Sequence, residues 1–330
     1  GAQLAIEEMN QAAGLRGLTL RLQAVDDQGS NAGAKQAAER LIQSEALAVI
    51  GHMTSDQCLA ALPVYEEHGK VLLSPTASTP LLSGRKDLFF RIQPATDLAA
   101  SAAAGYIVDV LKLKRICIVY DLNNEAFTRP YAEDFRKRAR GLGARVCKFV
   151  SFSSRERTAW EDIAQELAFR GPEAVFIIAS ARNTAGLVKH IRAEDEGCRL
   201  FSSEWARTEK LLEYGSEYVE GLTLVQLHSE RAAPKRFTSF AKGYRDRFGK
   251  TANYAAAQGY NAARLLVRGL KKADLQTQDL PDRLPEIKDF AGLYGPINLN
   301  PCGDFFSSIH LCRVKNGSFE YLTKISPNRK

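Results

Sequence analysis

Apolar residues recur along the chain with two spacings, one typical of strands and one typical of helices. Buried or alternating apolar runs predict strands, and apolar positions repeated once per helical turn predict amphipathic helices. The strands are expected at 18–25, 46–50, 71–73, 89–92, 115–120, 145–152, 174–179, 200–202, 222–227, 297–299, 307–314 and 319–324. The helices are expected from the first residues onward and at 31–44, 55–68, 96–111, 128–141, 160–169, 184–194, 235–248 and 255–272.

The chain contains two runs in which strands alternate with helices, and the second run begins after Pro94. Such alternation is typical of parallel sheets covered by helices on both faces. The fold class is therefore α/β, with two doubly wound parallel-sheet lobes. Near the end, Asn316 and Gly317 predict the turn of a β-hairpin. In doubly wound sheets ligands bind beyond the carboxyl ends of the strands, so the loops after these strands are the candidate site.

Composition narrows the class of protein. The chain has 330 residues, 45% of them hydrophobic, which suits two packed domains and excludes bulk disorder. No apolar run approaches the ~20 residues of a membrane-spanning helix. Lys and Arg exceed Asp and Glu by 45 to 38, but the basic residues are scattered among acids. A nucleic-acid-binding protein would concentrate them, so we expect no nucleic-acid partner.

No catalytic motif is present. The five histidines stand apart from any nucleophile motif, and there is neither a P-loop nor a glycine-rich dinucleotide turn after a strand. We therefore expect neither an enzyme nor a cofactor.

The six cysteines show no metal-ligand spacing, so no metal site is predicted. Their even number permits disulfides in an oxidising compartment. Cys302 and Cys312 could face each other across a hairpin, and Cys117 and Cys147 could lie on neighbouring strands. Six free thiols remain an equal alternative.

Eight stretches in the order of one known family lie mostly at the predicted loops and helix starts. They are GAQLAIEEMN at 1–10, VDDQ at 25–28, VIG at 49–51 followed by Ser55, LSPTASTP at 73–80, FRIQP at 90–94, SEWA at 203–206, GYNAA at 259–263 and GD at 303–304. On these residues the chain resembles the type I periplasmic binding proteins of the leucine/isoleucine/valine-binding family. The resemblance covers nearly the whole chain.

The resemblance implies two lobes joined by three crossovers, which close on a ligand by hinge motion. The amino-terminal lobe would comprise residues 1–94 and 229–303, and the carboxy-terminal lobe residues 95–228 and 304–330. Family members begin with a strand and a glycine-containing loop ahead of the first helix. We therefore expect a leading segment before Gly1 that supplies this strand.

Three residues of the amino-terminal lobe match family positions that contact the ligand. Ser55 starts a helix, whose positive end and hydroxyl suit a carboxylate. Ala77 and Ser78 follow a buried strand and offer a carbonyl, an N–H and a hydroxyl. Taken without the resemblance, these residues are simply a helix start and a turn.

In the carboxy-terminal lobe, Glu204 matches a family glutamate that pairs with the ligand's α-ammonium, and Trp205 beside it could form an apolar wall or only pack the lobe. The family's aromatic position falls on Glu125 in a gapless match, or on Phe127 two residues later. Phe127 would leave an apolar pocket and is the favoured alternative, while Glu125 would favour a ligand with extra positive charge. Ala181 and Asn183 are further candidate contacts, and Tyr254 is an additional one.

The resemblance implies a solute-binding protein that captures a small amino acid, hydrophobic or branched-chain in the favoured case, and delivers it to the membrane permease of an ABC importer. It would act as a monomer, periplasmic or otherwise extracytoplasmic, soluble or lipid-anchored. The alternatives are the ligand-sensing ectodomain of a receptor, and a binder of amides or aromatic acids.

Overall fold

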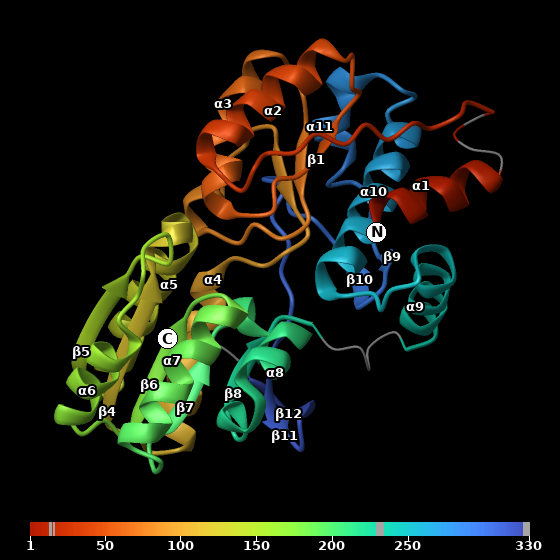
Figure 1. Cartoon of the computed structure of the whole chain (residues 1–330). Helices are drawn as coiled ribbons and strands as arrows, with labels where there is room; N and C mark the ends of the chain where they lie inside the picture. Colours follow the sequence, from red (N-terminus) through yellow and green to blue (C-terminus); the bar gives the residue numbers. More distant parts are fainter. Residues whose placement is uncertain (13–14, 16, 229–233, 326–330) are drawn as a thin grey trace. The chain divides into compact units, whose positions relative to one another are not determined.

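The computed structural model describes residues 1–12, 15, 17–228 and 234–325. The chain forms two compact units, and in each of them two separate stretches of sequence pack together (Figure 1). Unit 1 comprises Gly1–Ala95 and Ser229–Phe306, and unit 2 comprises Thr96–His228 and Ser307–Lys330.

Unit 1 is built on a parallel sheet in the order β1 (Val49–Ile50), β2 (Leu72–Ser74) and β3 (Phe89–Arg91). Successive side chains of β2 point to opposite faces, as strand geometry requires. Leu72 packs with α2 (Asn31–Gln43) and α3 (Ser55–Glu67), whereas Leu73 packs with α10 (Tyr254–Lys272) and α11 (Leu280–Arg283). Figure 1 shows these helix pairs on the two sides of the sheet.

The remaining elements of unit 1 cover α10. Helix α1 (Ala2–Gln11) packs on it through Leu4 and Ala5, and α9 (Pro234–Phe248) joins the same cluster through Phe240. An antiparallel pair, β9 (Phe290–Gly292) and β10 (Gly295–Ile297), completes the unit.

Unit 2 contains a seven-stranded sheet in the order β12-β11-β8-β7-β6-β4-β5. Its strands are β4 (Arg115–Asp121), β5 (Arg145–Phe152), β6 (Ala174–Ile178), β7 (Arg199–Ser202), β8 (Thr223–Gln226), β11 (Ile309–Lys315) and β12 (Ser318–Ile325). The neighbouring strands β5, β4, β6, β7 and β8 are parallel to one another. Strand β11 is antiparallel to both of its neighbours, β8 and β12. Asn316 and Gly317 have positive φ angles of 51° and 65°, which the tight turn between β11 and β12 requires.

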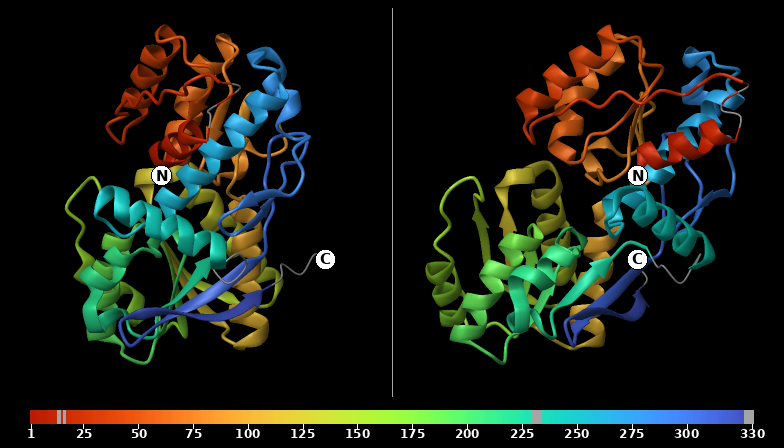
Figure 2. Two further views of the ribbon diagram at one scale, coloured as in Figure 1. Left: turned by 90° about the vertical axis from the view of Figure 1, so that its right-hand side faces the viewer. Right: turned by 45° about the vertical axis from the view of Figure 1, so that its right-hand side comes forward.

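Helices cover both faces of this sheet (Figure 2). One core contains α4 (Thr96–Gly105), which continues as a π-helical turn (Tyr106–Val110), and α5 (Glu125–Gly141). The other contains α6 (Trp160–Phe169), α7 (Ala181–Glu194) and α8 (Glu209–Gly215). The candidate residues of this unit follow β4, β6 and β7, at the starts of α5 and α7 and in the 3₁₀ turn at Glu204–Ala206.

One predicted strand, at 18–25, is wrong. This stretch pairs with no strand among the described residues, although Leu18 makes an isolated bridge to Leu15. The backbone at Leu20 is held instead by Asn10, whose amide oxygen accepts from Leu20 N–H at 2.8 Å and whose amide nitrogen donates to the Leu20 carbonyl at 2.9 Å. Alternation predicts which side chains share a face, but a strand also needs a paired neighbour.

The hairpin arrangement of Cys302 and Cys312 is also wrong. Cys312 lies in β11, opposite Tyr321 of β12, while Cys302 belongs to unit 1. The two cysteines therefore do not lie opposite each other in this hairpin. Smaller differences occur at two helix starts, because α5 begins at Glu125 and α7 at Ala181, three residues earlier than expected in each case.

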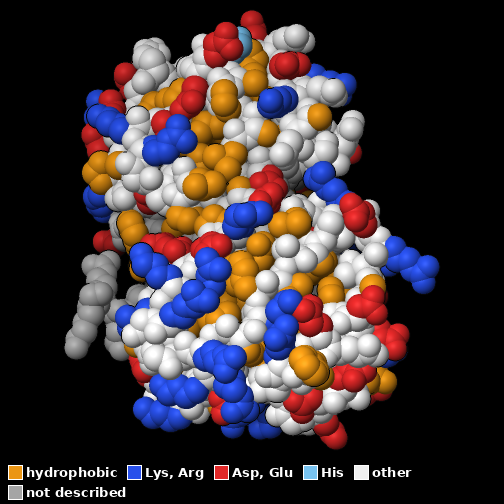
Figure 3. Space-filling view, turned by 90° about the vertical axis from the view of Figure 1, so that its left-hand side faces the viewer, with side chains coloured by type: hydrophobic (Ala, Val, Ile, Leu, Met, Phe, Trp, Pro, Cys, Tyr) orange, Lys and Arg blue, Asp and Glu red, His pale blue; other side chains and the backbone are white. Residues whose placement is uncertain are grey.

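The basic side chains on the surface are distributed as the sequence predicted. On the face shown in Figure 3, Lys and Arg side chains lie among acidic and hydrophobic ones. None of the helices in the described part of the chain is long and apolar enough to cross a membrane.

Candidate functional site

The first part of the candidate site is the start of α3 in unit 1. Thr54 caps the helix: its hydroxyl accepts from Gln57 N–H, and the Gln57 side chain accepts from Thr54 N–H at 3.2 Å. This reciprocal capping box leaves Ser55 as the first helical residue. The Ser55 side chain is therefore not needed as a cap, and it lies buried at 2% exposure.

Ser55 is hydrogen-bonded to the loop that follows β2. Its hydroxyl oxygen accepts from the backbone N–H groups of Ser78 at 3.3 Å and Thr79 at 3.2 Å. The adjacent Ala77 N–H donates to the Ser74 hydroxyl at 3.0 Å. The structure thus brings Ser55, Ala77 and Ser78 together in unit 1. The Ser55 hydroxyl, which already accepts two bonds, keeps its O–H to donate.

A buried ion pair stabilises the chain segment that follows β2. Arg91 of β3 contacts the Asp304 carboxylate at 2.6 Å and donates to the Thr79 carbonyl at 2.8 Å. The other carboxylate oxygen of Asp304 accepts from Gly84 N–H at 2.8 Å. Gly303, with φ +78°, lies so close to the Phe89 carbonyl that a Cβ atom would come within 2.6 Å of it. Sequence reasoning assigned no role to Arg91 or Asp304, although both lie in family-matching stretches.

Beside Ser55, a buried histidine links two parts of unit 1. His52 Nδ1 lies 2.9 Å from Asp27 Oδ2, and its Nε2 lies 3.2 Å from the Tyr65 hydroxyl. Burial acts to raise the pKa of Asp27, but hydrogen bonds from His52 and Gly29 outweigh it and hold the pKa below its usual value. Asp27 is therefore a fixed anion that orients the His52 ring.

The second part of the candidate site lies in unit 2, after β7. Glu204 begins a short 3₁₀ turn (Glu204–Ala206). Both of its carboxylate oxygens are shielded from solvent, and neither meets a hydrogen-bond partner among the described residues. Burial raises the pKa of Glu204 from its usual 4.5 to about 7, although its own backbone N–H and, to a smaller extent, the nearby Tyr131 hydroxyl lower it in part. A buried carboxylate without a partner costs free energy unless a cation or a proton compensates it.

Aromatic rings lie next to this carboxylate. The Phe127 ring meets Trp205 edge to face at a centroid distance of 5.7 Å, and it meets Tyr131 in the same way at 5.7 Å. Phe127 is 4% exposed and belongs to the core under α4 and α5. Phe127 and Trp205 thus form an aromatic contact beside Glu204, which directly precedes Trp205 in the chain.

The other candidates of unit 2 have partners of their own. Glu125 is about half exposed and forms an ion pair with Arg129 one helical turn later, at 2.6 Å. Asn183, on the first turn of α7, donates through its side-chain amide to Asp121 at 3.1 Å. Ala181 is the first residue of α7 and is buried. Asp121 itself also accepts from the N–H groups of Asn123 and Ser154, which ties three loops together.

Tyr254 lies in a buried polar network of unit 1. Its hydroxyl is hydrogen-bonded to Gln93, and Gln258 donates to the same hydroxyl at 3.1 Å. Gln258 also donates to the Ile92 carbonyl at 3.3 Å, while its own amide oxygen accepts from Asn261 at 3.0 Å. These bonds fix the chain just before it leaves unit 1.

Metal ligands and hollows are two further features of the described part of the chain that could mark a site. No group of three or more His, Cys, Asp or Glu side chains in the described residues is placed to hold a metal ion. A hollow of about 700 Å³ in unit 1 is lined by Glu66, Phe90, Pro285 and their neighbours, and one of about 250 Å³ in unit 2 by Arg192, Cys198 and Arg313 among others. Neither hollow contains a candidate ligand residue.

The comparisons with known proteins all find binding proteins. Residues 1–317 match the model of a family described as periplasmic binding protein. A curated relative, the amino acid binding protein of Pseudomonas aeruginosa, is 27% identical over 228 residues. That alignment covers 68% of this chain and 60% of the relative's length.

Two solved structures show the same fold. One is the branched-chain amino acid transporter substrate binding protein from Streptococcus pneumoniae in complex with isoleucine, with a TM-score of 0.90 and 19% identity over 99% of this chain and 93% of that one. The other is a solute binding protein of an ABC transporter from Rhodopseudomonas palustris in complex with benzoate, with a TM-score of 0.85 and 20% identity over 99% and 91%. The likeness confirms the predicted type I periplasmic binding protein fold.

Proposed function

The chain belongs to the periplasmic binding protein family, and from this premise we propose that it captures a small amino acid outside the cytoplasm and delivers it to an ABC importer. The family consists of binding proteins, in agreement with the expectation that the chain is no enzyme. Family membership also implies an extracytoplasmic location. The similar proteins are described as binding amino acids in one case and isoleucine in another, which supports an amino acid as the ligand.

Unit 1 offers groups suited to a carboxylate. The amino-terminal end of α3, a helix of 13 residues, presents backbone N–H groups and a positive partial charge. The Ser55 hydroxyl keeps a proton to donate, because its oxygen already accepts from Ser78 and Thr79. Ala77 and Ser78 line the same place through the loop after β2. We assign the ligand's α-carboxylate to these groups.

Glu204 in unit 2 is the observation that carries the proposal. Its carboxylate oxygens are shielded and have no hydrogen-bond partner among the described residues, while its neighbours are aromatic. An α-ammonium is the ligand group that compensates such a carboxylate, and the ring faces favour a cation as well. An α-amino acid carries both the carboxylate that the donors of unit 1 suit and the ammonium that the acid of unit 2 suits.

The surroundings of Glu204 favour an apolar side chain. Phe127 and Trp205 supply apolar side chains beside Glu204, and we assign to Phe127 the family's aromatic position, which the alternative interpretation gave to Glu125. Glu125 is half exposed and paired with Arg129, so a second ligand-facing acid is not needed to explain it. We therefore favour a branched-chain or other hydrophobic amino acid, with Ala181 and Asn183 as flanking contacts.

We propose further that the protein works as a monomer, soluble or lipid-anchored, and that its partner is the membrane permease of the importer. The description of the Streptococcus pneumoniae structure as a transporter substrate binding protein supports this partner.

A second candidate ligand is an aromatic acid. The Rhodopseudomonas palustris structure holds benzoate, and the pKa of Glu204, about 7, allows a protonated carboxyl that donates to an anion. The aromatic surface beside Glu204 suits such a ring equally well.

Calorimetric titration separates these ligands. The protein is first unfolded and refolded, so that any ligand retained from the cell is removed, and is then titrated with leucine, leucinamide, N-acetyl-leucine and benzoate. Binding of leucine alone supports the amino-acid assignment, because only leucine carries both the free carboxylate and the free ammonium. Binding of benzoate or N-acetyl-leucine as tightly as leucine would overturn the role of Glu204.

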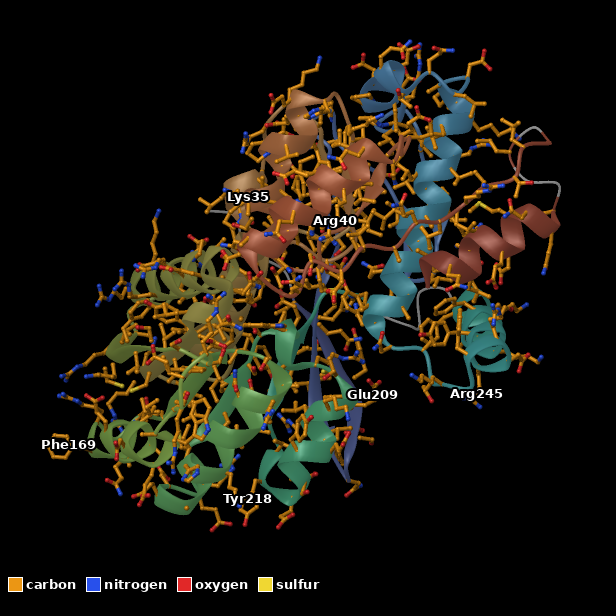
Figure 4. All side chains as sticks on the ribbon, turned by 45° about the horizontal axis from the view of Figure 1, so that its top comes forward. Lys35, Arg40, Phe169, Glu209, Tyr218 and Arg245 are labelled. Carbon is orange, nitrogen blue, oxygen red and sulfur yellow. The ribbon has the colours of Figure 1, made fainter. Side chains whose placement is uncertain are left out.

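The matched variants are Glu204→Gln and Glu209→Gln. Glu209, labelled in Figure 4, is an exposed acid on α8 of the same unit. We expect Glu204→Gln to weaken leucine binding at least a hundredfold, which corresponds to about 3 kcal/mol lost when a buried charge pair is broken. Glu209→Gln should leave the affinity unchanged.

A further inference from the structure

Two cysteines of unit 2 lie on adjacent parallel strands. Cys117 is in β4 and Cys147 in β5, which is the last strand on its side of the sheet. Their Sγ atoms are 2.7 Å apart, and both residues are thiols in this structure. This pair takes no part in the proposed ligand site.

The sheet register explains why the sulfur atoms meet. Ile116 is opposite Val146, but the next pair is Cys117 with Lys148, because the register shifts by one residue at this point. Cys147 and Lys148 therefore both oppose Cys117, as in a β-bulge. Cys117 and Cys147 both point to the face covered by α6 and α7, where they join the same apolar cluster.

We propose that Cys117 and Cys147 form a disulfide bond when the protein folds in an oxidising compartment, and that this bond fastens the edge strand β5 to β4. Neighbouring strands are ~4.8 Å apart, which lies within the Cα separation that disulfides span. An extracytoplasmic protein meets the redox conditions in which such bonds persist.

Exposure decides which thiol reacts first. Cys147 is partly exposed, whereas Cys117 is fully buried. A hydrogen bond from the Cys117 thiol lowers the pKa of Cys147, burial opposes this, and the backbone N–H groups of Cys147 and Lys148 lower the pKa further. Cys147 is therefore the thiol that an oxidant reaches as a thiolate, which is the reactive form.

The oxidant is a second disulfide, held by a thiol–disulfide oxidoreductase or by oxidised glutathione. The Cys147 thiolate attacks one of its sulfur atoms, forms a mixed disulfide and expels the other sulfur as a thiolate. Cys117 then loses its proton to solvent, and its sulfur attacks Cys147 Sγ and expels the second thiolate. The cysteine pair gives up two electrons and two protons, and the oxidant's disulfide is reduced to two thiols.

The other described cysteines are less suited. Cys58, Cys198 and Cys312 are buried, with exposures of 0%, 3% and 1%. Cys58 is directed at the His52 carbonyl at 3.5 Å, and Cys198 at the Arg199 carbonyl at 3.9 Å. We expect these to remain thiols, together with Cys302 of unit 1.

Peptide mapping tests the bond. The unfolded, reduced protein is refolded with a mixture of reduced and oxidised glutathione, alkylated with iodoacetamide and digested without reduction. Mass spectrometry should show the Cys117 and Cys147 peptides joined, two hydrogen atoms lighter than their sum, with the other four cysteines alkylated. Alkylation of both Cys117 and Cys147, or a link from Cys147 to Cys198, would overturn the proposal.

Matched variants test its effect. Cys147→Ala removes the more exposed partner and leaves a small apolar side chain, and Cys302→Ala is the control in unit 1. The cysteines are 30 residues apart in sequence, so the bond should raise the oxidised protein's midpoint over the reduced protein's by roughly 5–10 °C. This difference should vanish in Cys147→Ala and persist in Cys302→Ala. An equal difference in Cys147→Ala would assign the stabilisation to another bond and overturn the proposal.

Discussion

Arg91 and Asp304 form a buried ion pair with a nitrogen–oxygen distance of 2.6 Å, although 213 residues separate them in sequence. Their side chains are 1% and 5% exposed. Through Thr79 and Gly84, the pair fixes the segment that directly follows Ala77 and Ser78. Asp304, from the second sequence segment of unit 1, thus stabilises the first segment, which carries the proposed carboxylate site.

Asp304→Ala should destabilise the protein by about 3–5 kcal/mol, because it leaves the Arg91 guanidinium buried without its counter-charge. Urea denaturation followed by circular dichroism measures the loss. The control is Lys242→Ala, which removes the exposed partner of the exposed Asp246 on α9 and should cost no more than about 1 kcal/mol. Similar losses in the two variants would show that the buried pair does not support unit 1.

Ser55→Ala should cost about 1–3 kcal/mol of stability, because the buried N–H groups of Ser78 and Thr79 lose their acceptor. The same variant should weaken ligand binding, since the proposed donor to the ligand's carboxylate is removed and the loop after β2 loses its contact with α3. Ser239→Ala is the matched control, because the exposed Ser239 hydroxyl only donates to the Lys235 carbonyl within α9. If Ser55→Ala were as stable and bound as tightly as Ser239→Ala, its hydroxyl would have neither role.

The sequence predicted the secondary structure well where the signal is local. Helix α10 follows from its apolar spacing and from Asn253, which caps it by accepting from Ala256 N–H. The turn at Asn316 and Gly317 follows from the residues themselves, because both must adopt positive φ. The stretch 18–25 failed because its apolar alternation has no paired strand beside it among the described residues.

The candidate site could be predicted from the sequence only in part. The resemblance named Ser55, Ala77, Ser78 and Glu204, but no local pattern shows that Arg91 meets Asp304. Such a pair depends on tertiary contacts between distant segments. The one signal in the sequence is a charged residue, Arg91, within an otherwise apolar strand, and this signal does not identify the partner. In the same way, the choice between Glu125 and Phe127 depends on how α5 begins, which moved three residues from its expected start.

Trp205 should report ligand binding by fluorescence. The chain has two tryptophans, and only Trp205 is adjacent to Glu204. Trp160 packs instead against Phe152 at 4.9 Å in α6. Adding leucine should change the emission of the unmodified protein and of Trp160→Phe, but not that of Trp205→Phe. A change that survives in Trp205→Phe and is lost in Trp160→Phe would place the ligand elsewhere.

The stability of the ligand-free protein should fall as the pH rises from 4.5 to 7. Burial raises the pKa of Glu204 from its usual 4.5 to about 7, so the folded protein keeps a proton that the unfolded chain releases. In this window unfolding releases a proton, and a higher pH therefore favours the unfolded chain. Because one pKa unit corresponds to about 1.4 kcal/mol, the loss across the window should be about 3 kcal/mol, with no further change from this group above pH 7.

Glu204→Gln isolates this effect, because glutamine cannot titrate. Urea denaturation at several pH values, without ligand, should show a shallower decline for this variant than for the unmodified protein and for the exposed control Glu209→Gln. Saturating leucine should remove the decline in the unmodified protein, since the bound ammonium stabilises the ionised carboxylate. If the three ligand-free proteins lose stability equally between pH 4.5 and 7, the Glu204 carboxyl does not hold a proton in the folded state.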